Sequence, residues 1–177
     1  FSRIIRNLGH SVTFVDLSSL NVDRARSLGF EAHTLDLNSG LPIFTDAKFD
    51  LIVMLEIIEH VVAAEALLRE CRRVLRPGGS LLLSTPNFAY WANRARILLG
   101  NLSQDEGYHF RFFTPSILAR RLRDAGFAPI ACHHTAPAVG WNFVVNRLLG
   151  RPRLHIHVPR ALAPLFAHTL IVRAEAV

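Results

Sequence analysis

The sequence predicts an α/β fold in which a mostly parallel sheet has helices on both faces and an antiparallel last strand. Short apolar segments of strand length alternate with longer segments of helical periodicity along the 177 residues. Such alternation is typical of parallel sheets with right-handed crossover connections. The run LIVML at 51–55 is apolar throughout and flanked by charge, which predicts a central strand buried on both faces.

The N-terminal part of the chain predicts helix, strand and helix in turn. Residues 1–8 have the pattern of the last turns of a helix that Gly9 closes. The alternating segment SVTFVD at 11–16 predicts a strand. A helix is expected over 20–28, with Ser18 or Ser19 as its N-cap and Gly29 as its end.

The middle of the chain predicts two further strands and a helix. Strands are expected at 31–35 and 49–55, separated by a loop rich in Asn, Gly and Pro. The helix is expected from about 61 to 75, because its apolar residues recur every three or four positions. The sequence Pro-Gly-Gly that follows predicts the end of this helix.

The C-terminal half completes the pattern. We expect a strand at 80–85, a helix at 88–99, and a second helix that starts at Thr114 with Pro115 and ends at Gly126. Strands at 127–135 and 168–175 close the fold.

Composition favours one globular domain, 1–177, in the cytoplasm. No apolar run reaches the roughly 20 residues that span a bilayer, and no signal peptide is visible. Cys71 and Cys132 form no CxxC motif and are expected to be packing residues in a reducing compartment. The net charge of +6 comes from arginines scattered over helix surfaces, so it does not imply a nucleic acid partner.

Residues 136–167 are expected to form an insertion or a lid before the last strand. Within this segment, residues 141–160 mix Trp, Phe and aliphatic residues with arginines and histidines. Three roles besides packing on the sheet stay open: a lid, a peripheral membrane contact and an oligomer contact.

Two carboxylates and a histidine directly follow the predicted central strand. Glu56, Glu59 and His60 have the i, i+3, i+4 spacing that brings side chains to one face of a helical turn. In open α/β sheets, ligands bind outside the carboxyl ends of the strands, so these residues predict a functional site. The alternative is structural: acids favoured at the start of the next helix and a packed histidine.

Five motifs resemble class I S-adenosylmethionine-dependent methyltransferases, in particular the small-molecule branch that includes ubiquinone-biosynthesis O-methyltransferases. They are VTFVDLS ending at Ser18, LDLNSGLPI from Leu35, FDLIVMLEIIEH from Phe49, LRPGGSLLLSTPN from Leu75 and YHFRFFTPSIL from Tyr108. The segment NFAYWANRARILLG from Asn87 also resembles the methionine-biosynthesis group of these proteins.

The resemblance implies a Rossmann-like methyltransferase sandwich that binds S-adenosylmethionine. By this resemblance Asp16 accepts hydrogen bonds from the ribose, Asp36 and the backbone of Leu37 meet the adenine, and Leu17 and Leu55 line the cofactor site. Without the resemblance, Asp16 is equally well read as a helix cap and Asp36 as the start of a turn.

The glycine-rich loop of this family does not occur in the sequence. The acidic ribose ligand of related nucleotide folds lies about 20 residues beyond such a loop. Counting back from Asp16 therefore places the loop before Phe1, and we expect the chain to be N-terminally incomplete, without its first strand and loop.

The resemblance also implies an acceptor side. ExxEH with a later histidine is similar to the ubiquinone-type enzymes, and the implied metal ligands are Glu56, Glu59, His60 and His109, with Mg²⁺ or Mn²⁺ as the cation. His60, His109 and Glu56 are the expected catalytic residues. An acceptor pocket that uses these residues without metal stays open.

The predicted function is methyl transfer from S-adenosylmethionine to a small-molecule acceptor, through a hydroxyl oxygen. Aromatic side chains at 88, 90 and 91 could wall an apolar acceptor pocket or belong to the core, and His109, Arg111 and Phe112 are better pocket candidates. Two alternatives are an RNA 2′-O-methyltransferase and a non-catalytic partner protein of this fold.

Overall fold

The computed structural model describes residues 2–101, 108–135 and 163–177. Six strands are present in this part of the chain: β1 (Thr13–Asp16), β2 (Glu31–Thr34), β3 (Phe49–Leu55), β4 (Leu75–Pro86), β5 (Phe127–Thr135) and β6 (Thr169–Ala176). The α-helices are α1 (Ser2–Asn7), α2 (Ser19–Ser27), α3 (Ala64–Val74), α4 (Trp91–Leu98), α5 (Pro115–Asp124) and α7 (Ala163–Phe166). Two 3₁₀ turns, η1 (Leu37–Ser39) and η2 (Ile58–His60), follow β2 and β3.

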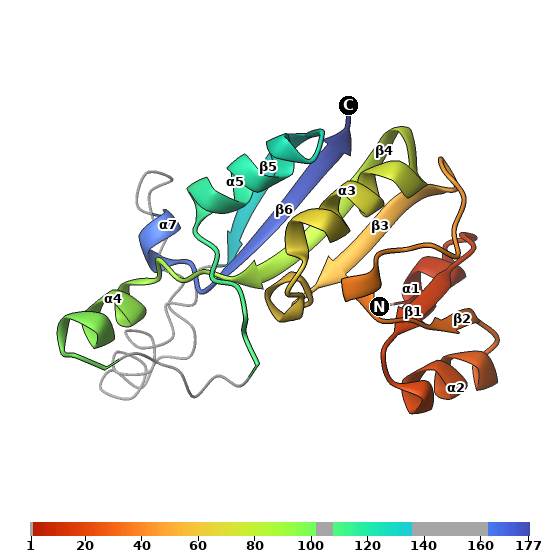
Figure 1. The fold of residues 1–177 in the computed structure, drawn as a ribbon, viewed down its shortest axis with the longest axis horizontal. Helices are drawn as coiled ribbons and strands as arrows, with labels where there is room; N and C mark the ends of the chain where they lie inside the picture. Colours follow the sequence, from red (N-terminus) through yellow and green to blue (C-terminus); the bar gives the residue numbers. More distant parts are fainter. Residues whose placement is uncertain (1, 102–107, 136–162) are drawn as a thin grey trace, which may run out of the picture.

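The strands form two sheets (Figure 1). β1 and β2 pair in parallel as a two-stranded sheet, and the other four strands lie in the order β3-β4-β6-β5. β3 is parallel to β4, whereas the last strand, β6, is antiparallel to both of its neighbours. The predicted α/β class with an antiparallel last strand is confirmed.

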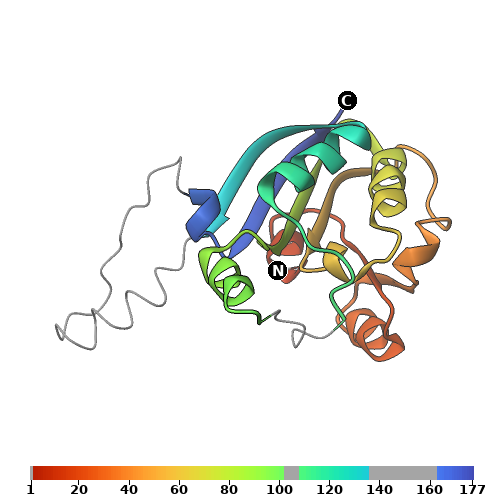
Figure 2. The ribbon, with the colours of Figure 1, turned by 60° about the vertical axis from the view of Figure 1, so that its left-hand side comes forward.

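The main core lies between the four-stranded sheet and the helices α3 and α5, which run across one face of it (Figures 1 and 2). Leu67 and Leu68 of α3, Leu122 of α5 and Leu81 of β4 are all fully buried there. Each such leucine contributes about 1.5–3 kcal/mol relative to an exposed side chain. A smaller cluster around Val22 joins α2 to the two-stranded sheet.

The expectation that residues 51–55 form a central strand buried on both faces is wrong. β3 lies at the end of the four-strand order, and within the described residues it pairs only with β4. Leu51 and Leu55, which point to the same face of the strand, are 46% and 40% exposed, whereas Met54 on the other face is buried. An apolar run therefore predicted the strand correctly but not its place in the sheet.

Two helices begin later than predicted, and a third begins where predicted. α4 begins at Trp91 rather than 88, because the Asn87 side chain accepts a hydrogen bond from the Ala89 amide (3.0 Å) and forms an Asx turn. α3 begins at Ala64 rather than 61, because η2 intervenes. The predicted start at Thr114 is confirmed: its hydroxyl accepts from the Ile117 amide at 3.3 Å.

Of the helices in the described residues, none is long and apolar enough to cross a membrane. The predicted lid or insertion at 136–167 and the membrane contact at 141–160 fall almost entirely outside the described residues, which resume at 163. Both stay predictions.

Candidate functional site

The ExxEH segment lies at the edge where β3 and β4 end. Because these strands are parallel, their carboxyl ends meet, and the Glu56 amide donates to the Ser84 carbonyl of β4 (3.1 Å). Glu56 has a φ of 52°, so the chain turns sharply out of the strand there. The next residues form η2, which carries Glu59 and His60.

Glu59 is the most constrained carboxylate of the site. It is 1% exposed, and its Oε2 accepts a hydrogen bond from the Thr85 hydroxyl at 3.1 Å. Its Oε1 is buried and has no hydrogen-bond partner among the described residues. Burial raises the pKa of Glu59 above its ordinary value, and the neighbouring Glu56 charge adds to this increase. A buried oxygen without a donor is expensive unless a cation or proton satisfies it.

The loop at 108–112 crosses over this turn. The backbone carbonyl of Glu59 accepts from the amides of Phe110 (2.9 Å) and Arg111 (3.1 Å). His60 Nδ1 lies 3.2 Å from the Tyr108 carbonyl, and since a carbonyl only accepts, Nδ1 carries the proton and Nε2 is left as a lone-pair donor. The loop therefore brings His109 to the turn.

Glu59, His60 and His109 form a cluster of donors suited to a divalent cation. One carboxylate oxygen and one nitrogen from each ring all lie within 4.8 Å of one another, and the two imidazole centroids are 4.7 Å apart. A carboxylate with two imidazoles suits Mn²⁺ or Zn²⁺, and Mg²⁺ with added water. The unpartnered Glu59 Oε1 is the observation that fits a cation here.

Glu56 does not join this cluster in the described structure. It is exposed, and its Oε1 accepts from the Ser84 hydroxyl at 2.7 Å. Three of the four implied metal ligands are thus brought together and the fourth lies apart, so its role as a ligand or catalytic residue stays a prediction.

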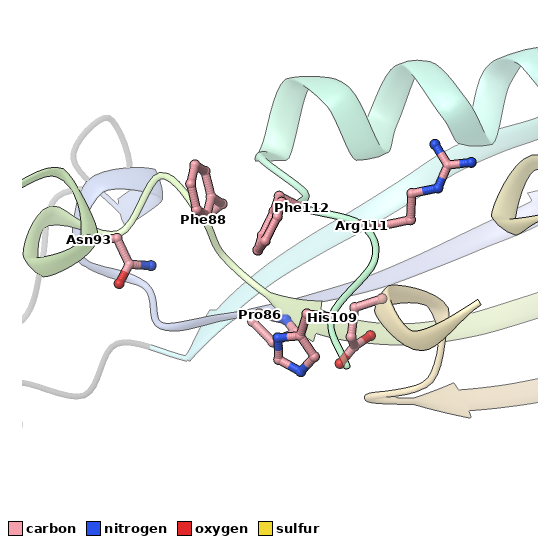
Figure 3. Close-up of a pocket in the computed structure, with 7 residues that line it drawn as sticks. Pro86, Phe88, Asn93, His109, Arg111 and Phe112 are labelled. Atoms are coloured by element: carbon pink, nitrogen blue, oxygen red, sulfur yellow. The ribbon is translucent and has the colours of Figure 1, made fainter. Parts of the chain in front are cut away.

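A pocket adjoins the cluster (Figure 3). It holds about 320 Å³ of empty space, part of it open to solvent. Its walls come from β4, α4 and the 108–112 loop, and the lining residues are Glu59, Pro86, Phe88, Asn93, His109, Arg111 and Phe112. The rings of Phe88 and Phe112 lie side by side, with their centroids 4.8 Å apart and an angle of 43° between their planes. Glu59 and His109 therefore belong to both the cluster and the pocket.

Arg111 was predicted to be a pocket residue, but its charged group is bound elsewhere. Its guanidinium points away from the other labelled side chains in Figure 3. It donates to the Val62 carbonyl (2.6 Å) and pairs with Glu65 (3.3 Å). This arginine anchors the loop, and its charge is directed away from the pocket. Tyr90 and Trp91 pack on each other and do not line this pocket.

The two predicted cofactor aspartates lie at the ends of adjacent strands. β1 and β2 are parallel, and the Leu35 amide donates to the Asp16 carbonyl (3.0 Å), so both carboxylates stand at one rim of this sheet. Asp16 accepts from the Ser18 amide (2.8 Å), and Asp36 accepts from the Asn38 amide (2.9 Å). The turn weighed for Asp36 is therefore present, whereas the N-cap of α2 is Ser18 and not Asp16. Cofactor contact stays a prediction for both aspartates.

The loop after Asp36 is linked to the ExxEH turn. The Asn38 side-chain oxygen accepts from the Val62 amide at 2.9 Å, just beyond η2. Of the apolar residues predicted to contact the cofactor, Leu17 is 70% exposed, Leu55 is partly exposed, and Leu37 packs against the main core. An exposed leucine beside these loops is free to contact a ligand.

Sequence reasoning missed the contacts that Ser84 and Thr85 make with the ExxEH turn, of which only that of Thr85 reaches a residue of the cation cluster. Both hydroxyls reach the glutamates of ExxEH, although the motif containing them had been noted. The available signal was two consecutive hydroxyl residues at the carboxyl end of the strand that follows ExxEH. Asn93 was missed as well, because only the fold brings α4 to the pocket.

Comparisons with known proteins agree with the fold. A family model described as "Methyltransferase domain" matches residues 1–131. Among solved structures, an S-adenosylmethionine-dependent methyltransferase from Methanosarcina mazei superposes with a TM-score of 0.67 at 18% identity, covering 100% of this chain and 87% of the other. A 1,6-didemethyltoxoflavin-N1-methyltransferase from Burkholderia thailandensis, solved with S-adenosylhomocysteine, gives a TM-score of 0.61 at 20% identity, over 99% of this chain and 65% of the other.

A curated relative is similar in sequence. A ubiquinone biosynthesis O-methyltransferase from Xanthomonas oryzae pv. oryzae is 32% identical over 134 residues, which are 70% of this chain and 56% of the relative. This chain thus spans a little over half the length of that relative. The family match covers most of the chain and includes the ExxEH turn and the 108–112 loop. The chain belongs to the S-adenosylmethionine-dependent methyltransferase family.

Proposed function

We propose that the protein transfers a methyl group from S-adenosylmethionine to a hydroxyl oxygen of a small molecule, with a divalent cation held by Glu59, His60 and His109. The observation that carries this proposal is the buried Glu59 carboxylate: its Oε1 has no partner in the described structure, and one of its oxygens lies within 4.8 Å of a nitrogen of each of two imidazoles. Glu59 also lines the adjoining pocket. Similarity to a ubiquinone biosynthesis O-methyltransferase supports oxygen as the acceptor atom.

The chemistry needs alignment and loss of one proton. When bound, the cofactor would supply the methyl carbon and leave as the thioether S-adenosylhomocysteine, and the hydroxyl proton of the acceptor would pass to solvent. A bound cation lowers the pKa of the hydroxyl it contacts. The protein's own task is to hold both reactants in line and exclude water.

The residues divide between two sides. Asp16 and Asp36 are proposed to accept hydrogen bonds from the ribose and adenine of the cofactor. Glu59 Oε1, His60 Nε2 and a His109 nitrogen are proposed to hold the cation, and the adjacent rings of Phe88 and Phe112 give the acceptor an apolar wall. His60 keeps its orientation because the Tyr108 carbonyl holds Nδ1–H.

The test combines binding and turnover. Calorimetry on the chain extended upstream to include the expected glycine-rich loop should detect S-adenosylmethionine binding. Formation of S-adenosylhomocysteine by the same protein should be followed with a panel of hydroxylated small molecules. Chelation should abolish turnover, and Mn²⁺ or Mg²⁺ should restore it. Glu59→Gln and His109→Ala should lose the cation response, whereas Glu175→Gln, an exposed glutamate on β6, should keep it. Full turnover in chelator would remove the cation from the proposal, and no cofactor binding at millimolar concentration would contradict the enzyme itself.

The two alternative functions give different outcomes in the same experiments. An RNA 2′-O-methyltransferase would bind RNA with a steep dependence on salt concentration. A non-catalytic partner protein would bind neither cofactor nor acceptor. A cytoplasmic location, which we also propose, predicts recovery in the soluble fraction of native cells.

A further inference from the structure

Two neighbouring hydroxyls of β4 each bind one glutamate of the ExxEH turn. The Ser84 hydroxyl donates to Glu56 Oε1 at 2.7 Å, and the Thr85 hydroxyl donates to Glu59 Oε2 at 3.1 Å. Leu55 of β3 lies opposite Ser84 in the parallel register, so the chain leaves β3 beside these hydroxyls. The end of β4 therefore holds both carboxylates from outside their own turn.

The two hydrogen bonds occupy different environments, because successive side chains of a strand point to opposite faces. Thr85 and Glu59 are both fully buried, whereas Glu56 is exposed. Of the two glutamates, only Glu59 belongs to the cation cluster. Ser84 thus offers a matched comparison: the same kind of bond, one residue away, to a carboxylate outside the cluster.

The bond from Thr85 has a geometric consequence. It occupies one oxygen of Glu59, and the other oxygen, Oε1, is left without a partner in the described residues. The backbone of Glu59 is also fixed, since its carbonyl accepts two amides of the 108–112 loop. With one carboxylate oxygen and the backbone held, the direction of the free oxygen is set.

We propose that Thr85 is a positioning residue: it holds the Glu59 carboxylate so that Oε1 is presented to a divalent cation between His60 and His109. Thr85 does not touch the cation itself. This inference rests on the cation site of the proposed function. Groups that orient a metal ligand from behind typically change metal affinity about 10- to 100-fold when they are removed.

The test measures Mn²⁺ affinity by calorimetry on the chain without cofactor, with the spectrum of free Mn²⁺ in electron paramagnetic resonance as a second readout. Thr85→Val keeps the shape but removes the hydroxyl, and we expect Mn²⁺ affinity to fall at least about tenfold. Thr85→Ser restores the hydroxyl and should bind within about threefold of the natural protein. Ser84→Ala should also stay within that range, because Glu56 is outside the cluster.

The outcomes separate the two proposals. If the natural protein binds Mn²⁺ and Thr85→Val binds it equally well, the positioning role is wrong and the cation site stands. If the natural protein does not bind Mn²⁺, the cation site fails and the positioning role fails with it. An equal loss in Ser84→Ala would show a general effect of the β4 end and would also overturn the role of Thr85. Circular dichroism on each variant verifies folding, and Thr85→Ala replaces the valine variant should that one not fold.

Discussion

Glu59→Gln tests whether the buried carboxylate destabilises the protein when no cation is present. Burial raises the pKa of Glu59, so the folded state holds its proton more tightly than the unfolded state. The stability from this group is therefore fully present below the unfolded pKa of about 4.5 and is lost as pH rises through the folded pKa. The mutation replaces the ionisable group with a neutral one that can still accept from Thr85.

The structure sets the size of the effect. A buried group without a partner costs about 1–3 kcal/mol, and Glu59 Oε1 is such a group in the described residues. We expect Glu59→Gln to be more stable than the natural protein by about 1–2 kcal/mol at pH 8 in chelator. The difference should shrink as pH falls toward 4.5, with a slope of at most about 1.4 kcal/mol per pH unit for one group.

A cation should reverse this order. A ligand at 100 times its dissociation constant stabilises the folded state by about 2.7 kcal/mol. Urea unfolding from pH 5 to 8.5, in chelator and in saturating Mn²⁺, measures both effects, with Glu175→Gln as the exposed control. If Glu59→Gln is less stable than the natural protein at every pH in chelator, the reasoning about the unpartnered oxygen is refuted.

Three further changes test the core, a helix cap and the cofactor side. Leu122→Ala, at a fully buried site of α5, should lower the free energy of unfolding by about 2–5 kcal/mol in urea titrations, and a loss below 1 would contradict its place in the core. Thr114→Ala removes the bond to the Ile117 amide and should cost about 1 kcal/mol in the same assay, whereas Thr114→Ser should restore it. Asp16→Asn should weaken S-adenosylmethionine binding about tenfold in calorimetry, from loss of a charged acceptor, and unchanged affinity would exclude ribose contact.

The sequence predicted where helices and strands lie along the chain better than it predicted which of them lie side by side in the fold. Alternation and glycine stops located the helices and strands, because these signals are local. The exposed edge of β3 was missed, since the apolar run at 51–55 says nothing about which strands pair with it. The late start of α4 was missed because the Asn87 side chain competes for the backbone there.

The candidate site was also predicted only in part, because local patterns name some of its residues and the fold brings in the others. The spacing predicted that Glu56, Glu59 and His60 share one face of a turn, but only Glu59 and His60, which are adjacent in the sequence, belong to the cluster. Glu56 lies apart, because its backbone has a φ of 52° and stands before the turn at 58–60. His109 lies 49 positions beyond His60, and only the resemblance to a family named it before the fold did. The hydroxyl of Thr85 reaches Glu59 because β3 pairs with β4. The register of this pairing cannot be predicted from the sequence of either strand alone.

The short loop at 108–112 carries residues of both the proposed cation cluster and the pocket. His109 contributes to the cation cluster and Phe112 to the wall of the pocket, while the carbonyl of Glu59 holds the peptide between them. A molecule that parts Phe112 from Phe88 must shift this loop and with it the imidazole. If the proposed cation binds here, occupancy of the pocket and occupancy by the cation would be energetically linked through this loop, and each would change the affinity of the other by the same factor.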